Sequence, residues 1–397
     1  MATYYVAKTG NDSNAGTSQA APKLTIASAI GVASTTGDVV EIIDEGTYSE
    51  NTLRVFTSQL TIRHTASELG RPVVDATGGG NLAEVYGEFL TLIGLEIKGG
   101  TSETLKLGDG DYHKFHLSGC FIHETPRLGS NVFNNTSGTP STIKQSVLYF
   151  DGTAVGSPIN CQSGLEISNC LITASAGTIP VLQGYSTTTN TASFSTIIHR
   201  GASNTGLIVA GWSKVINCIV SGSGKGIGSD DHTYNLLDVS GEDFRNYADN
   251  SNGSAGTGDV VDTDPEFEDG SAIGGTVEVY ESFKLASVSS PAVDTADGTF
   301  RDSDGNLITI DLAGAERPNP LGGSYDKGAY EFIQVWSDYT PDRERKWGSD
   351  LTINATQNSL DGRKYALSTH NRQAPYSQTI RGVPSIRLRS TPAKSEK

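Results

Sequence analysis

Seven side chains that can move protons or bind ligands lie close together in the sequence. They are Asp109, Asp111, His113, His116, His123, Glu124 and Arg127. A second group consists of Asp230, Asp231 and His232. Imidazole and carboxylate groups could act together as general acid and base, and paired carboxylates can hydrolyse glycosidic bonds. Neither group forms a recognised catalytic motif, so we interpret both as solvated loop side chains and assign no catalytic residue.

Metal binding has little support in the sequence. Residues 302–306 read Asp-Ser-Asp-Gly-Asn, which has some features of a calcium loop but not the EF-hand spacing, so we interpret them as a turn. The cysteines form neither a C-x-x-C pair nor a Cys/His metal spacing. We therefore expect neither a metal ion nor a cofactor.

One short phrase recurs along the middle of the chain. Leu-Ser-Gly-Cys-Phe-Ile at residues 117–122 returns as Ile-Ser-Asn-Cys-Leu-Ile at 167–172 and as Val-Ile-Asn-Cys-Ile-Val at 215–220. Successive copies are 22 to 26 residues apart when the following positions are taken as equivalent: Leu95, Cys120, Ser146, Cys170, Thr196 and Cys218. A period in this range predicts a repeat architecture.

Each copy is a short apolar strand that ends in a Gly, Asn or polar turn, and nothing between copies has the periodicity of a helix. We therefore predict an all-β fold, a right-handed single-stranded parallel β-helix in which each coil pairs with the next. The small residues at the repeated position would form an internal ladder, with the cysteines packing as small hydrophobes. A β-sandwich is the less favoured alternative, because its turns recur every ~8–12 residues.

Residues 1–34 are predicted to form an N-terminal cap. Residues 4–6 read as a strand, residues 10–17 as a cluster of turns and residues 22–30 as a short helix. Such a cap would cover the unpaired strand edges at the end of the solenoid.

The N-terminal pattern resembles pectate-lyase-like right-handed β-helix proteins, which include bacterial surface proteins, polysaccharide lyases and phage virion proteins. The residues that carry it are Tyr5-Val6, Gly10-Asn11-Asp12, Gly16-Thr17, Pro22, Thr25-Ile26 and Ala29-Ile30. Later motifs resemble the C-terminal coils of the same family. They are Asp264-Pro265-Glu266-Phe267, Ser290-Pro291-Ala292-Val293-Asp294, Asp311 to Pro318 and Asp326 to Glu331. Lys327 departs from the pattern, because an apolar residue is usual there.

The resemblance covers about residues 3–333 and implies a β-helix over 35–333, with the later motifs shaping final coils rather than catalysis. Lyases of this family use an arginine or lysine base, often with stacked acidic residues that hold calcium. We take Ala174 and Gly222 as the equivalents of Glu124 two and four coils later, and neither supplies a carboxylate. We therefore lean towards a protein that is not an enzyme and leave the enzymatic alternative open.

Charge divides the chain in two. The whole chain has a net charge of −16, of which residues 341–397 contribute +6 and the first 340 residues −22. The acidic body argues against a nucleic-acid partner. No run of 18 apolar residues predicts a membrane span. The N-terminus lacks the basic and apolar regions of a secretory signal, so we expect synthesis and folding in a cytoplasm.

Residues 334–397 match no part of the family pattern and are basic. We interpret them as an assembly arm, which would order by docking, rather than as a disordered tail. The residues that we expect to make assembly contacts are Trp336, Trp347, Arg381, Arg387 and Arg389.

Our first hypothesis is a structural bacteriophage virion protein: a tailspike, tail-fibre or head-decoration subunit presenting a rigid β-helix. It would form a homo-oligomer, with a trimer as the first expectation, contact other virion proteins through residues 334–397 and offer a surface to host polysaccharide. The alternative is a polysaccharide lyase or glycoside hydrolase on the same fold. A bacterial adhesin exported without a secretory signal is less favoured, because no anchoring module is evident.

Overall fold

The computed structural model describes most of the first 332 residues. The gaps are residues 51, 65–69, 87, 101–102, 108–113, 126–127, 135–139, 151–156, 176–179, 185–189, 202–206, 230, 241–242, 245–252, 270–281 and 319–322. The chain consists of two compact units, Met1–Phe332 and Ile333–Lys397, and all described residues belong to the first. The predicted assembly residues Trp336, Trp347, Arg381, Arg387 and Arg389 therefore lie outside the described residues, and the domain boundaries stay predictions.

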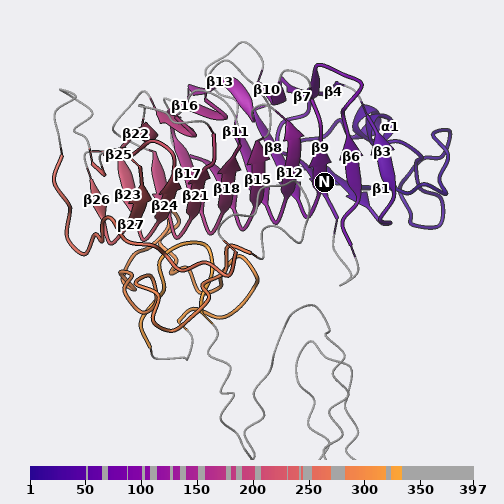
Figure 1. Cartoon of the computed structure of the whole chain (residues 1–397). Helices are drawn as coiled ribbons and strands as arrows, with labels where there is room; N and C mark the ends of the chain where they lie inside the picture. Colours follow the sequence, from indigo (N-terminus) through magenta and orange to yellow (C-terminus); the bar gives the residue numbers. More distant parts are fainter. Residues whose placement is uncertain are drawn as a thin grey trace, which may run out of the picture. The chain divides into compact units, whose positions relative to one another are not determined.

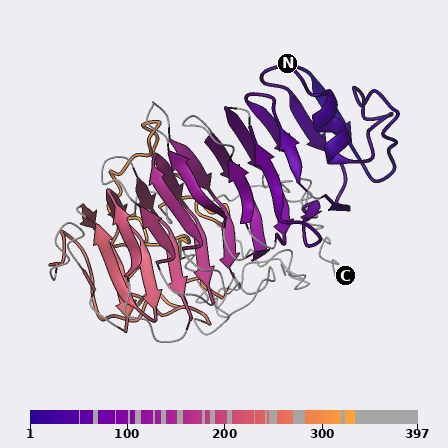
Figure 2. The same ribbon diagram turned by 90° about the horizontal axis from the view of Figure 1, so that it is seen from above.

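Parallel strands from successive coils form three faces (Figures 1 and 2). The first face, sheet A, has ten strands: β1 (Thr3–Val6), β2 (Val39–Ile42), β5 (Leu60–Arg63), β8 (Phe89–Ile93), β11 (Lys114–Ser118), β14 (Ser141–Lys144), β17 (Leu165–Ser168), β20 (Thr191–Ser193), β23 (Lys214–Ile216) and β26 (His232–Thr233).

Sheet B has nine strands: β3 (Thr47–Ser49), β6 (Val73–Asp75), β9 (Glu96–Lys98), β12 (Phe121–Thr125), β15 (Val147–Phe150), β18 (Leu171–Ala174), β21 (Thr196–His199), β24 (Ile219–Gly222) and β27 (Leu236–Val239). The third face consists of a three-stranded sheet of β4 (Leu53–Val55), β7 (Asn81–Val85) and β10 (Glu103–Leu107). It continues in a five-stranded sheet of β13 (Gly129–Asn134), β16 (Ile159–Ser163), β19 (Leu182–Gly184), β22 (Leu207–Trp212) and β25 (Lys225–Ser229).

Every named strand pair is parallel, and one strand per coil joins each face in turn. This arrangement confirms the predicted parallel β-helix. Within each strand, alternate side chains point into the solenoid. One inward row of sheet A, for example, stacks in register with side chains that are at most 3% exposed: Leu92, Leu117, Ile143, Ile167, Ala192 and Val215. The core is thus a set of continuous apolar columns.

A two-residue turn joins sheet A to sheet B in the repeated phrase. Its first residue has a left-handed backbone, with φ of 68° at Gly94, 63° at Gly119, 52° at Asn169 and 57° at Asn217. Glycine and asparagine adopt this conformation most readily, which explains why they precede the repeated small residue.

The small residues form the predicted internal ladder. The backbone N–H of Cys120 donates to the hydroxyl of Ser146, and that of Cys170 to the hydroxyl of Ser195, each over 3.2 Å. The four cysteines are buried and unpaired, and burial raises the pKa of the Cys170 and Cys218 thiols to about 12. They are therefore inert packing groups.

The position predicted for Thr196 in this ladder is wrong by one residue. Thr196 pairs in register with Leu171 and Ile219 on the outer side of sheet B, and Ser195 occupies the ladder. The register follows the strand pairing, whereas the spacing in sequence also depends on loop lengths that differ between coils.

The N-terminal cap contains the only helix within the described residues, α1 (Ile26–Val32). Its N-cap Thr25 accepts a hydrogen bond from the Ser28 N–H, and Ile26 and Ala29 are fully buried. The Asp12 carboxylate accepts hydrogen bonds from the N–H groups of Leu24 and Thr25 and so fixes the loop before the helix. No helix among the described residues is long and apolar enough to span a membrane.

The strands end with β27, and residues 253–269, 282–318 and 323–332 form what we call the C-terminal segment. The resemblance implied final coils here. The segment instead lies against the outer face of sheet B (Figure 1, orange). Its apolar residues Phe283, Leu285, Ala292, Ala329 and Tyr330 cover outward side chains of the helix. Those covered are Phe121, Val147, Leu171, Ile198, Ile219 and Leu236. The segment packs here because the outer face of sheet B has an apolar strip, and burying that strip is favourable.

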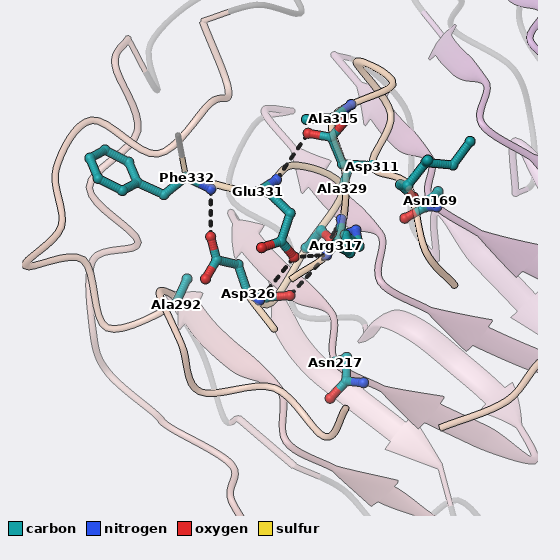
Figure 3. Close-up of polar contacts among 12 residues, drawn as sticks. Asn169, Asn217, Ala292, Asp311, Ala315, Arg317, Asp326, Ala329, Glu331 and Phe332 are labelled. Carbon is teal, nitrogen blue, oxygen red and sulfur yellow. Dashed lines mark hydrogen bonds and ion pairs between the residues drawn. The ribbon is translucent and has the colours of Figure 1, made fainter. Parts of the chain in front are cut away.

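A buried ion network holds the C-terminal segment in shape (Figure 3). Arg317 Nη1 lies 2.9 Å from Glu331 Oε1, and neither side chain is exposed. The guanidinium also donates to the carbonyls of Asp326 and Gly328. The Asp311 carboxylate accepts the N–H of Glu331. The motif residues named here therefore connect the turns of the C-terminal segment to one another.

We predict that Glu331→Gln destabilises the C-terminal segment strongly. It leaves the buried Arg317 charge without its partner, which typically costs about 3–5 kcal/mol. Thermal unfolding together with limited proteolysis of the segment would measure the loss. Glu316→Gln is the control, because Glu316 is exposed and should change stability by less than about 0.5 kcal/mol. Unchanged proteolysis of Glu331→Gln would show that the network does not hold the segment.

Lys327 is fully buried in this segment, and its Nζ donates to the Gly258 carbonyl over 2.9 Å. Burial lowers the pKa of Lys327 to about 8. A base whose pKa falls on folding destabilises the native state when it is protonated. The penalty, on the order of 3 kcal/mol, is therefore complete below about pH 8 and fades towards the unfolded value near pH 10.5.

We predict that Lys327→Met is more stable than the wild type at pH 7, because it removes this buried charge. The advantage should shrink as the pH rises from 8 to 10, since the wild-type lysine then loses its proton in the native state and the buried charge disappears. Chemical unfolding of both proteins across this pH range would test the prediction. A pH-independent difference would assign the effect to packing instead.

Candidate functional site

Five polar side chains form what we call the outer-face cluster, on sheet B. They are Asp75 from β6, Glu96 and Lys98 from β9, and His123 and Glu124 from β12. Asp75, Lys98 and His123 pair in register on successive coils. Their strand neighbours Val74, Ile97 and Ile122 are buried in the core, so strand alternation directs the three polar side chains outward.

His123 is at the centre of the cluster. Its Nε2 lies 3.0 Å from Glu96 Oε1, and its Nδ1 lies 3.7 Å from Glu124 Oε1. Lys98 Nζ lies 3.3 Å from the other oxygen of Glu124. The His123 ring stacks on Phe121 with 4.5 Å between centroids. The imidazole is therefore packed on one side and flanked by two carboxylates.

A β-bulge places Glu124. Between β12 and β15, Ile122 pairs with Leu148 but Thr125 pairs with Phe150, so two residues of β12 stand opposite one residue of β15. Glu124 has a left-handed backbone with φ of 52°, and its side chain is 46% exposed. Bulges re-aim side chains and are frequent beside active sites.

This bulge corrects the predicted equivalence of Glu124 with Ala174 and Gly222. Thr125 pairs with Phe150, and the same column of paired residues continues through Ala174, His199 and Gly222. Glu124 is the additional residue of the bulge and has no equivalent in this column. Ala174 and Gly222 are therefore equivalent to Thr125, and not to Glu124.

Asp75 extends the cluster towards the N-terminus. The backbone N–H of Thr77 donates to its carboxylate over 2.9 Å, and hydrogen bonds from Thr77 lower the pKa of Asp75, helped by Lys98 and His123. Asp75 is therefore ionised at neutral pH and supplies fixed negative charge.

The arrangement contains the groups that acid–base chemistry needs, because a histidine between two glutamates can exchange a proton with either.

Carboxyl groups with raised pKa values lie elsewhere among the described residues. Burial raises the pKa of Asp326 to about 6, and it also raises the pKa of Glu50 and Asp311. Each of these three accepts backbone hydrogen bonds in the cap or the C-terminal segment. Their shifts therefore reflect burial in structural contacts.

The other candidates from the sequence are separated by the fold. Asp109, Asp111, His113, Arg127 and Asp230 lie outside the described residues. His116 is on sheet A rather than sheet B, where its Nδ1 lies 2.5 Å from Thr142 Oγ1. Burial and Lys144 lower its pKa to about 4, so the imidazole is neutral at pH 7.

The second predicted group serves the end of the solenoid. His232 Nδ1 lies 2.8 Å from Asp259 Oδ2, and the Asp259 side chain is fully buried. Burial alone would raise the pKa of Asp259, but hydrogen bonds from His232, Asn235 and Gly256 outweigh it and lower the pKa. Asp231 pairs loosely with Lys214, 3.6 Å away. The contact between His232 and Asp259 connects the last coil to the C-terminal segment.

Asp75, Glu96 and Lys98 were not predicted as site residues. Their positions relative to His123 were available in principle, because Asp75, Lys98 and His123 follow one another at steps of 23 and 25 residues. Among the described residues, no group of three or more His, Cys, Asp or Glu side chains is arranged to hold a metal ion.

Strand pairing therefore defines a parallel β-helix protein with a polar cluster on one face. No protein-family model matches the chain, and no curated protein matches it. Two similar solved structures are crystal structures of GH136 lacto-N-biosidase from Eubacterium ramulus. The selenomethionine derivative is 11% identical with a TM-score of 0.34, covering 66% of this chain and 67% of the other. The native protein is 12% identical with a TM-score of 0.30, covering 65% and 67%. Likeness at this level carries no argument about activity.

We predict that Glu96→Gln and His123→Gln each lower stability by about 1 kcal/mol, because each weakens the hydrogen bond between His123 and the Glu96 carboxylate in a partly exposed site. Thermal unfolding would measure both. Catalytic sites are often strained, so removing a functional residue frequently raises stability. A higher melting temperature in either variant would contradict the structural interpretation of the cluster.

Proposed function

We propose that this protein is a structural component of a bacteriophage particle, in which the β-helix is a rigid, non-catalytic body. The observation that carries the proposal is the attachment of the C-terminal segment to several coils, through sheet A and the turns between sheets A and B. Asn217 exchanges two hydrogen bonds with the backbone of Asp297, and Asn169 donates to the carbonyl of Ile310. Lys144 on β14 lies 3.1 Å from Asp302.

These contacts join residues 80 to 158 positions apart in the chain, so they brace several coils at once. A particle subunit needs such rigidity, whereas an enzyme needs free acid and base groups facing a substrate. The two sets of motifs resemble a β-helix family that includes phage virion proteins as well as bacterial surface proteins and polysaccharide lyases, and placement on a particle is consistent with that resemblance. Under this proposal the chain forms a homo-oligomer and meets other virion proteins through residues 334–397.

A glycan-degrading enzyme is the second candidate, and the bulge at Glu124 is the observation that favours it. The bulge exposes a carboxylate next to a histidine and to a second carboxylate, Glu96. If this candidate were right, the outer-face cluster would supply the acid and base. The internal ion pairs of the cluster favour the structural candidate.

We predict that gradient-purified particles of the phage encoding this chain contain the protein, detectable by peptide mass spectrometry and by antibody labelling in electron micrographs. The purified protein should release neither reducing ends nor unsaturated products from a panel of bacterial polysaccharides.

Absence of the protein from intact particles would overturn the placement. Release of reducing ends that is lost in Glu124→Gln, with the control Glu316→Gln still active, would instead establish the enzymatic candidate.

A further inference from the structure

A hollow of about 340 Å³ lies on the outer face of sheet A, close to the N-terminal cap. Its lining residues are Met1, Gly37, Gln59, Thr61, Phe89 and Thr91. The volume falls in the range of about 300–1,000 Å³ that is typical of small-molecule sites. The hollow is on a different sheet from the outer-face cluster, so it is a separate feature.

The hollow follows from the register of three coils. Val39, Thr61 and Thr91 pair with one another, and Gly37, Gln59 and Phe89 each lie two residues earlier in the chain and line the hollow. Glycine leaves its place empty, whereas phenylalanine two coils later provides a tall wall. A Cβ atom at residue 37 would lie 3.0 Å from Met1 Cγ, so a larger residue there would crowd this end of the hollow.

Phe89 is held in position from the side away from the hollow. Its ring lies 4.1 Å from the His116 ring, measured between centroids. His116 is itself fixed by its contact with Thr142 and is neutral at pH 7. The wall is therefore an aromatic ring that is already ordered before any ligand arrives, which reduces the entropy lost on binding.

The lining combines one aromatic face with hydroxyl and amide groups and contains no ionisable side chain. Thr61 and Thr91 point outward, because their strand neighbours Leu60, Ile62, Leu90 and Leu92 are buried in the core. A charged ligand would find no counter-ion among these side chains, and a purely apolar ligand would leave the hydroxyl and amide groups without partners. A ligand with a C–H face and a hydroxyl rim satisfies both parts of the lining.

We propose that this hollow binds a neutral pyranose residue of a glycan, with the ring stacked on Phe89 and its hydroxyls bonded to Gln59, Thr61 and Thr91. The inference holds wherever the protein is located, so it does not depend on the proposed particle role.

Saturation-transfer NMR of the full-length protein with neutral gluco-, galacto- and manno-oligosaccharides would test this site. At least one of them should receive saturation from the protein, and binding should be unchanged between pH 6 and 8. Phe89→Ala and Thr91→Val should each weaken binding by at least about tenfold, the effect of losing a central contact.

Phe56→Ala is the matched control. Phe56 is 67% exposed and follows β4 on the third face, where it stacks on Tyr86 rather than lining the hollow. It should bind like the wild type. Failure of every neutral oligosaccharide to bind at millimolar concentration, or equal binding by Phe89→Ala and the wild type, would overturn the proposal. Either result would leave the particle test unaffected.

Discussion

Parallel hydrogen bonding between equivalent strands of successive coils is the constraint on which the structure depends. Strands pair with the equivalent strands of the neighbouring coils. The position of a residue in this pairing therefore decides whether its side chain points into the core or outward. The apolar columns, the cysteine–serine ladder and the left-handed turns at Asn169 and Asn217 are all consequences. The outer-face cluster has the same origin, because Asp75, Lys98 and His123 stand in one column of sheet B.

Charge in this protein is used in two different ways. In the C-terminal segment, Arg317 and Glu331 are removed entirely from water, and their geometry compensates for the desolvation with several backbone hydrogen bonds. The Lys327 ammonium donates to the Gly258 carbonyl, and burial lowers its pKa. In the outer-face cluster, by contrast, the Lys98–Glu124 pair is partly solvated, so each such pair contributes little.

The fold was predictable from the sequence because the constraint is itself repetitive. Spacing, apolar strands and the Gly or Asn before Cys120 and Cys170 all reflect one coil geometry. The prediction failed where register and spacing separate: Ser195 replaces Thr196 in the ladder, and the bulge at Glu124 shifts the column by one residue. The position of the C-terminal segment could not be predicted, because its motifs specify turns such as that at Gly328 but not the surface they meet.

The C-terminal segment packs closely against sheet B at Gly328, since a Cβ atom there would lie 2.8 Å from Thr196 Oγ1. The chain reaches Phe332 directly from this contact, and the Asp326 carboxylate accepts the Phe332 N–H. Tension applied at Phe332 would therefore load many lateral contacts of the segment in shear, rather than peel one strand from the end of the stack. Such a load would act on several coils at once, whereas the uncovered end of a solenoid would fray coil by coil.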